Sequence, residues 1–142
     1  MMIRVMVSRN VSKGGGPAIF LDRLTSALEQ TGEVRIVGTS GKPHIHLSMI
    51  ALGRRIPRVK TVVRIDGMYW NKADPVGPKW NQRIKESIRR ADGVVYQSLF
   101  CQRCCEKNFG KTRRFAIIHN GVDQDKIREM DVEPKKRTSL VA

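Results

Sequence analysis

The stretch Met2–Gly32, MIRVMVSRNVSKGGGPAIFLDRLTSALEQTG, decides the fold. Its apolar opening, Met2–Val7, is rich in β-branched residues and predicts a buried strand that ends at a loop. Beyond three glycines, Pro17 suits the first position of a helix over 17–31, which Gly32 stops. One face of this helix carries apolar side chains at helical spacing: Phe20, Leu24, Ala27 and Leu28.

The alternation of strands and helices continues along the chain. Further strands are expected over 34–37, 44–49, 59–65, 94–96 and 115–118, and further helices over 79–91 and 99–109. Loops are expected over 40–43 and over 66–78, where Gly and Pro recur. Most of the strands are continuous apolar runs, which is typical of parallel strands covered on both faces. The sequence therefore predicts an α/β domain of three layers, with a mostly parallel sheet between helices.

The net charge indicates which classes of binding partner to expect. Lys and Arg number 27 against 13 Asp and Glu, a formal charge of +14 on 142 residues. This excess attracts nucleic acid, nucleotides, phosphorylated sugars or acidic lipid surfaces, unless the basic residues only solvate helix faces. No apolar run approaches the roughly 18 residues of a membrane span, and an odd number of cysteines favours a reducing compartment. We expect a cytoplasmic protein that can approach the inner face of the membrane.

The glycine-rich loop is a candidate anion site. Gly14, Gly15 and Gly16 stand between a strand and a helix N-terminus, where unpaired N–H groups and the helix dipole favour a phosphate, and Lys13 adds charge. Neither common nucleotide-loop fingerprint, G-x-G-x-x-G or G-x-x-x-x-G-K-[ST], is present. A tight turn that needs positive φ angles is the alternative.

Three segments carry a family resemblance: KGGGPAIFLDRLTSALEQTG (13–32), ADGVVYQSLFCQRCCEKNFG (91–110) and FAIIHNGVDQDKI (115–127). Together they resemble the N-terminal, acceptor-side domain of GT-B-fold retaining glycosyltransferases. The resemblance runs from about Ile3 to Ile127, and its most specific part is Ile118–Asp123. It implies a Rossmann-like domain that faces a second one across a cleft holding a nucleotide-diphospho-sugar donor, with no cofactor and no bound metal. The acceptor would be a glycan or a lipid-linked or phosphorylated molecule.

The resemblance also implies site residues. The loop toward the donor phosphates or sugar would be Gly14, Gly15 and Gly16 with Lys13, and the turn at the cleft would be formed by His119, Asn120, Gly121 and Asp123. Residues 1–132 would form the domain, and 133–142 a linker and the start of a missing C-terminal domain, unless this is an ordinary frayed end. Without that partner domain we expect the chain to be inactive. A stand-alone glycan-binding remnant is a further possibility.

Asp66 departs from the family pattern. Many members have a histidine after the fourth strand, near the transferred sugar, and Asp66 stands about there. As a catalytic residue it would orient a sugar hydroxyl or stabilise oxocarbenium-like charge; otherwise it is a turn aspartate that bonds its own backbone beside Gly67. Arg64 would pair with Asp66 or with a phosphate. Tyr69 and Trp70 would contact the acceptor or else cover the end of the sheet.

The cysteines and histidines have structural explanations. A zinc site would need a second spaced pair of ligands besides Cys101, Cys104 and Cys105, and His119 is the only nearby candidate. A redox C-x-x-C motif would need supporting signatures elsewhere in the chain, and there are none. We expect them to be small apolar residues that face the sheet. His44 and His46 alternate on a strand, so one of them should point inward and make a hydrogen bond.

A basic face supports the competing function. One expected helix carries Lys79, Arg83, Lys85, Arg89 and Arg90, and the preceding loop adds Arg54, Arg55 and Arg58. A glycosyltransferase would use such a face to dock at an anionic membrane surface. A basic α/β nucleic-acid-binding module would use it on phosphates, although no reading motif accompanies it.

Overall fold

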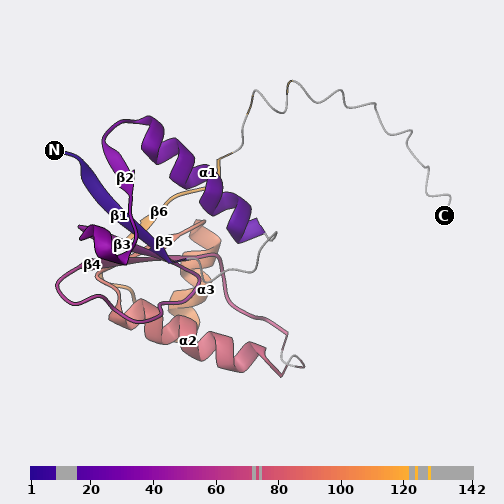
Figure 1. The fold of residues 1–142 in the computed structure, drawn as a ribbon. Helices are drawn as coiled ribbons and strands as arrows, with labels where there is room; N and C mark the ends of the chain where they lie inside the picture. Colours follow the sequence, from indigo (N-terminus) through magenta and orange to yellow (C-terminus); the bar gives the residue numbers. More distant parts are fainter. Residues whose placement is uncertain (9–15, 72, 74, 122–123, 125–127, 129–142) are drawn as a thin grey trace.

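The computed structural model of the chain describes residues 1–8, 16–71, 73, 75–121, 124 and 128. Within them, six strands form one sheet in the order β2-β1-β3-β4-β5-β6, and every pairing is parallel (Figure 1). The strands are β1 (Ile3–Ser8), β2 (Val34–Ile36), β3 (Ile45–Met49), β4 (Lys60–Ile65), β5 (Gly93–Tyr96) and β6 (Phe115–Ile117). The predicted parallel sheet is confirmed.

Among the elements that the structure describes, the α-helices that cover the sheet are α1 (Gly16–Gln30), α2 (Gly77–Arg90) and α3 (Leu99–Phe109). The connection through α1 runs from β1 to β2, whereas those through α2 and α3 run toward the opposite edge. Crossovers of this type are right-handed, so a reversal of direction moves the helices to the other face. The chain therefore has α1 on one face and α2 and α3 on the other (Figure 1), the predicted Rossmann-like three-layer arrangement.

The core lies between the sheet and the pair α2 and α3. Alternate side chains of β4 and β5 pack there against one face of each helix, and the cluster consists of Val63, Ile65, Ile84, Ile88, Val94, Tyr96, Cys101 and Cys105. The expectation that cysteines face the sheet is confirmed for Cys101 and Cys105, while Cys104 is half-buried. On the opposite face, Leu21 is the fully buried residue of α1, although the predicted stripe did not include it.

The predicted boundaries agree with the structure to within two residues, and the largest error is instructive. Helix α2 begins at Gly77, so Gly77 and Pro78 belong to the helix and not to the loop over 66–78. A proline loses no hydrogen bond in a first turn, where the N–H has no helical partner. Ser98 caps α3 by accepting from the backbone N–H of Cys101, and Gly110 ends it with φ +95°.

The connection between β3 and β4 contains no helix. It packs on α2 instead, where the backbone N–H of Leu52 donates to the Ser87 hydroxyl at 2.7 Å. Ala51 and Leu52 are buried, so the connection takes the place that a crossover helix would occupy. In the described part of the chain, no helix is long and apolar enough to cross a membrane.

Candidate functional site

The candidate site lies at the carboxyl edge of the sheet. Because all strands are parallel, the segments that follow them meet at one edge. Asp66 directly follows β4, His119, Asn120 and Gly121 follow β6, and α1 begins there at Gly16. Lys13, Gly14, Gly15 and Asp123 lie outside the described residues. The two predicted parts of the cleft that the structure describes, the start of α1 and the turn after β6, are thus at the same edge.

Arg64 joins two of the predicted residues. Its guanidinium forms an ion pair with the Asp66 carboxylate through Nη1 and donates through Nη2 to the Asn120 side-chain oxygen at 2.5 Å. Arg64 is 3% exposed although it is a cation. The Asp66 carboxylate, one of the two partners expected for Arg64, is in contact with it. A buried arginine with two side-chain acceptors is firmly held in one orientation.

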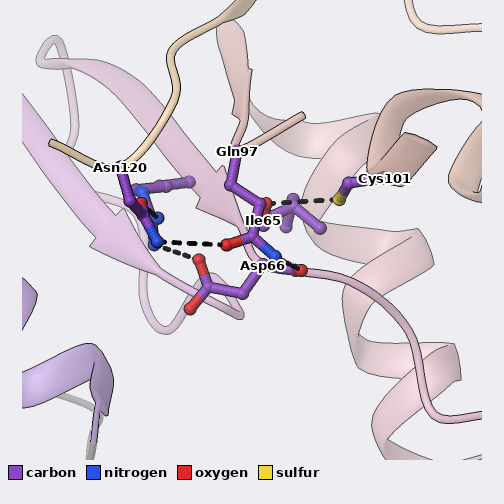
Figure 2. A network of polar contacts seen from close by, with 6 residues as sticks. Ile65, Asp66, Gln97, Cys101 and Asn120 are labelled. Carbon is purple, nitrogen blue, oxygen red and sulfur yellow. Dashed lines mark hydrogen bonds and ion pairs between the residues drawn. The ribbon is translucent and has the colours of Figure 1, made fainter. Parts of the chain in front are cut away.

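Gln97 completes the network between the strands, as Figure 2 shows. Its amide nitrogen donates to the backbone oxygen of Asp66, and its side-chain oxygen accepts from the Asn120 amide at 3.4 Å. From α3, the Cys101 thiol donates to the backbone oxygen of Ile65, the residue before Asp66, at 3.4 Å. Gln97 was not predicted as a site residue, although its place directly after an apolar strand was a usable signal.

Helix α1 touches the network through Phe20. The Arg64 guanidinium carbon lies 3.8 Å from the centre of the Phe20 ring, a close cation–π contact. Phe20 was predicted only as a member of the apolar stripe. The contact ties the first turns of α1 to the end of β4, so the start of the helix and Asp66 keep a fixed relation.

Burial shifts the pKa values of both members of the Arg64–Asp66 ion pair. Burial raises the pKa of the Asp66 carboxyl, and the neighbouring Arg64 opposes this with its charge and hydrogen bond. Burial also lowers the pKa of the Arg64 guanidinium, which still carries its charge at neutral pH. The Asp66 side chain is 28% exposed, so one side of the carboxylate is open to a ligand. Within the described residues it pairs with Arg64 and not with its own backbone, unlike the turn alternative.

The aromatic residues are attached to α2. Tyr69 stacks on Trp80 with ring centres 6.3 Å apart, and its backbone N–H and C=O both bond to the Asn81 side chain. Trp70 is 58% exposed. His119 and Gly121 are also exposed. Tyr69 is therefore attached to α2, and the Trp70 indole next to it is exposed to solvent.

A second polar contact lies at the end of β1. The Ser8 hydroxyl and the His46 Nε2 are 2.5 Å apart, and His46 is almost completely buried. Burial lowers the pKa of His46, so the ring is neutral at physiological pH. His44, by contrast, is exposed and bonds Arg4. The expectation that one of the two histidines points inward is confirmed.

The described site gathers polar groups with different chemistry. It offers a carboxylate, an amide and a buried cation at the start of a helix. Within the described residues, no group of three His, Cys, Asp or Glu side chains is arranged to hold a metal ion. Comparison of the chain with models of protein families, with curated proteins and with solved structures finds no match. The site geometry and the residue motifs are therefore the grounds for proposing a function.

Proposed function

We propose that the chain is the acceptor-side half of a retaining glycosyltransferase. The full enzyme would transfer a sugar from a nucleotide-diphospho-sugar to a glycan or to a lipid-linked or phosphorylated acceptor. In this proposal the carboxyl edge of the sheet is one wall of the cleft, and a second lobe supplies most of the nucleotide pocket. The chain alone would then bind substrate weakly and turn it over slowly or not at all.

One observation carries the proposal. Arg64 holds Asp66 and Asn120 together, and the same guanidinium packs on Phe20 near the start of α1. The segments that resemble the glycosyltransferase family thus converge at one edge, although they are far apart in the sequence. Such an edge is where ligands bind in open parallel sheets.

The proposed roles follow from the chemistry of the groups. The open side of the Asp66 carboxylate would accept a hydrogen bond from a sugar hydroxyl or stabilise positive charge that develops at the anomeric carbon. Arg64 is a positioning residue, because its guanidinium is buried and committed to Asp66 and Asn120. The N–H groups at the start of α1 would attract the donor diphosphate.

Ligand binding tests the proposal directly. Saturation-transfer NMR would be recorded on the chain with UDP-glucose and GDP-mannose as donor probes. We expect weak binding of at least one donor and a clear loss in Asn120→Ala and Asp66→Asn. Glu33→Gln, an exposed acidic site away from this edge, is the matched control for the change in charge and should bind as wild type does. Absence of binding to both donors, or equal binding by all variants, contradicts the proposal.

A turnover assay tests the half-site claim. The chain would be incubated with the donor that binds and with simple glycosides, and release of nucleotide diphosphate would be followed. We expect no release above the rate of the uncatalysed reaction. Robust turnover by the chain alone would show that a second lobe is not needed.

A basic nucleic-acid-binding module is the second candidate, favoured by the charge of +14 and by one helix face. Lys79, Arg83, Arg89 and Arg90 are all exposed on α2. A mobility-shift assay with duplex and single-stranded oligonucleotides over a salt series discriminates between the two. Micromolar or tighter binding near physiological salt, with a steep dependence on salt, favours this candidate over sugar transfer.

A further inference from the structure

A pocket lies at the amino edge of the sheet, opposite the candidate site. It is enclosed by the last turns of α2 and α3 and by the segments that precede β5 and β6. Its volume is about 460 Å³, which falls within the range of roughly 300–1,000 Å³ common for small-molecule sites. Hereafter it is the basic pocket, after the four cations that line it: Arg89, Lys111, Arg113 and Arg114.

These cations are not neutralised by neighbouring carboxylates. All four are exposed, and within the described part of the chain none of them forms an ion pair. Asp92 is the one acidic residue in the lining. Its carboxylate is already engaged, because it accepts from the Thr61 backbone N–H at 2.8 Å and pairs with Arg55 at 2.9 Å and Lys60 at 3.6 Å.

Helix dipoles offset only part of the positive charge. The carboxyl ends of α2 and α3 meet at the pocket, and each contributes about half a negative charge. The Glu106 carboxylate also lies beside the pocket, where it accepts from the backbone N–H of Thr112 at 3.1 Å. Even if the Asp92 and Glu106 charges are both counted in full, an excess of about one positive charge remains. An anion of about that charge would balance it.

The pocket also has an apolar wall. Ile88 and Val94 are buried members of the core that reach its surface, and Phe109 is half-buried beside them. The Thr112 hydroxyl, which also lines the pocket, is hydrogen-bonded to the Tyr96 hydroxyl at 2.6 Å. A ligand with a phosphate and an adjoining apolar body matches this combination better than a bare inorganic anion, because each part meets a complementary surface.

We propose that the basic pocket binds an organic phosphate, with the phosphate on the Lys111, Arg113 and Arg114 side chains and the apolar body against Ile88, Val94 and Phe109. A nucleotide, through its base, and an anionic phospholipid, through its acyl chains, both have this chemistry. The site is independent of the proposed sugar-transfer function, since the two lie at opposite edges of the sheet. Its failure would leave that function untouched.

The experiment uses one charge-removing variant and one matched control. Lys111→Gln/Arg113→Gln/Arg114→Gln removes three cations from the pocket, and Arg23→Gln/Arg35→Gln/Arg103→Gln removes three exposed cations that lie outside the pocket and outside the basic face of α2. Both lower the formal charge of +14 by the same amount. Calorimetric titration with ATP and with pyrophosphate measures the nucleotide arm. Co-sedimentation with phosphatidylcholine vesicles, with and without phosphatidic acid, measures the lipid arm, and circular dichroism checks folding.

We expect the pocket variant to lose at least about tenfold in affinity for ATP or for phosphatidic acid vesicles, whichever wild type binds, whereas the control stays within about threefold. Tighter binding of ATP than of pyrophosphate supports contact of the base with the apolar wall. If the triple variant does not fold, Arg113→Gln at its exposed site replaces it, with Arg35→Gln as control. Equal losses in both variants, absence of binding to every probe, or binding of oligonucleotides alone would overturn the proposal.

Discussion

Arg64 donates through Nη2 to the side-chain oxygen of Asn120 over 2.5 Å, although 56 positions separate the two residues. Arg64 belongs to β4, and Asn120 follows β6, so the bond spans the end of β5. It therefore fixes the turn after the last strand relative to the middle of the sheet.

Asn120→Ala should destabilise the protein. The change removes an acceptor from a guanidinium that is almost completely buried, and an unsatisfied buried donor costs about 1–3 kcal/mol. Urea unfolding at neutral pH measures the free energy of unfolding. His119→Ala, at the exposed neighbouring position, is the control and should change it by less than about 0.5 kcal/mol. Equal effects of the two changes would mean that the Arg64 bond contributes nothing.

Two substitutions of Asp66 should have different effects on stability. Asp66→Asn keeps an acceptor for Arg64 and removes a carboxylate whose ionised form burial disfavours, so at neutral pH it should be at least as stable as wild type. Asp66→Ala also removes the acceptor and should be about 2 kcal/mol less stable than Asp66→Asn. Urea unfolding of the three proteins measures both differences. A marked loss in Asp66→Asn would show that the ionised pair stabilises the fold.

The same carboxyl gives a pH dependence of known sign. Because burial raises the pKa of Asp66, the folded protein keeps this proton at pH values where the unfolded chain has lost it. The contribution of Asp66 is therefore full below about pH 4 and is lost as pH rises through the folded pKa. Wild type should lose stability relative to Asp66→Asn over that window in a series of urea unfolding curves. A gain with rising pH contradicts this.

Asp92 should show the opposite dependence. The backbone N–H of Thr61 is the main cause that lowers the pKa of Asp92, and Arg55 and Lys60 add to it. Its stabilisation is present above about pH 4 and is lost as pH falls through the folded pKa. Asp92→Ala should cost about 1–2 kcal/mol at neutral pH, since both basic partners are largely exposed and screened. Urea unfolding at neutral and at acid pH measures the loss of stability in Asp92→Ala, with Glu33→Ala as the control. If the loss in Asp92→Ala is as large at acid pH as at neutral pH, the prediction is wrong.

The Tyr96 phenol should lose its proton at a higher pH than a solvent-exposed tyrosine does. It is completely buried, its hydroxyl bonds Thr112 at 2.6 Å, and burial raises its pKa to about 12. The folded protein keeps this proton longer than the unfolded chain does, so stability should fall as pH rises through that range. Alkaline absorbance titration of tyrosinate in wild type and Tyr96→Phe checks it. A late phase that survives in Tyr96→Phe would assign it to another group.

Much of the fold could be predicted because it depends on local patterns. Continuous apolar runs such as Phe115–Ile117 mark parallel strands, and the residues Ser98 and Gly110 mark the two ends of α3. The predicted start of α2 was wrong because glycine and proline are common both in loops and in the first turn of a helix, as Gly77 and Pro78 are here. Composition alone does not separate those two cases.

The site could be predicted only in part. The family resemblance implied that Asp66 and Asn120 belong to one cleft, and the structure has both at the carboxyl edge of the sheet. The partner of Arg64 could not be chosen, since it depends on the register that aligns Ile65 with Tyr96 and Tyr96 with Ile117. The contact of Phe20 with the guanidinium is likewise tertiary, and the apolar spacing of α1 contains no sign of it.

The all-parallel sheet also determines the order in which the chain should fold. No two neighbouring strands can be joined by a hairpin, so every pairing first closes a loop and loses chain entropy. The shortest of these loops joins β3 to β4, where Ile45 aligns with Lys60, and the longest joins β1 to β3, where Val5 aligns with Ile45. We expect pulse-labelled hydrogen exchange to detect protected amides in β3 and β4 before β1, and simultaneous protection would contradict this. The carboxyl end of β1, which precedes α1, would then be among the last parts of the molecule to become ordered.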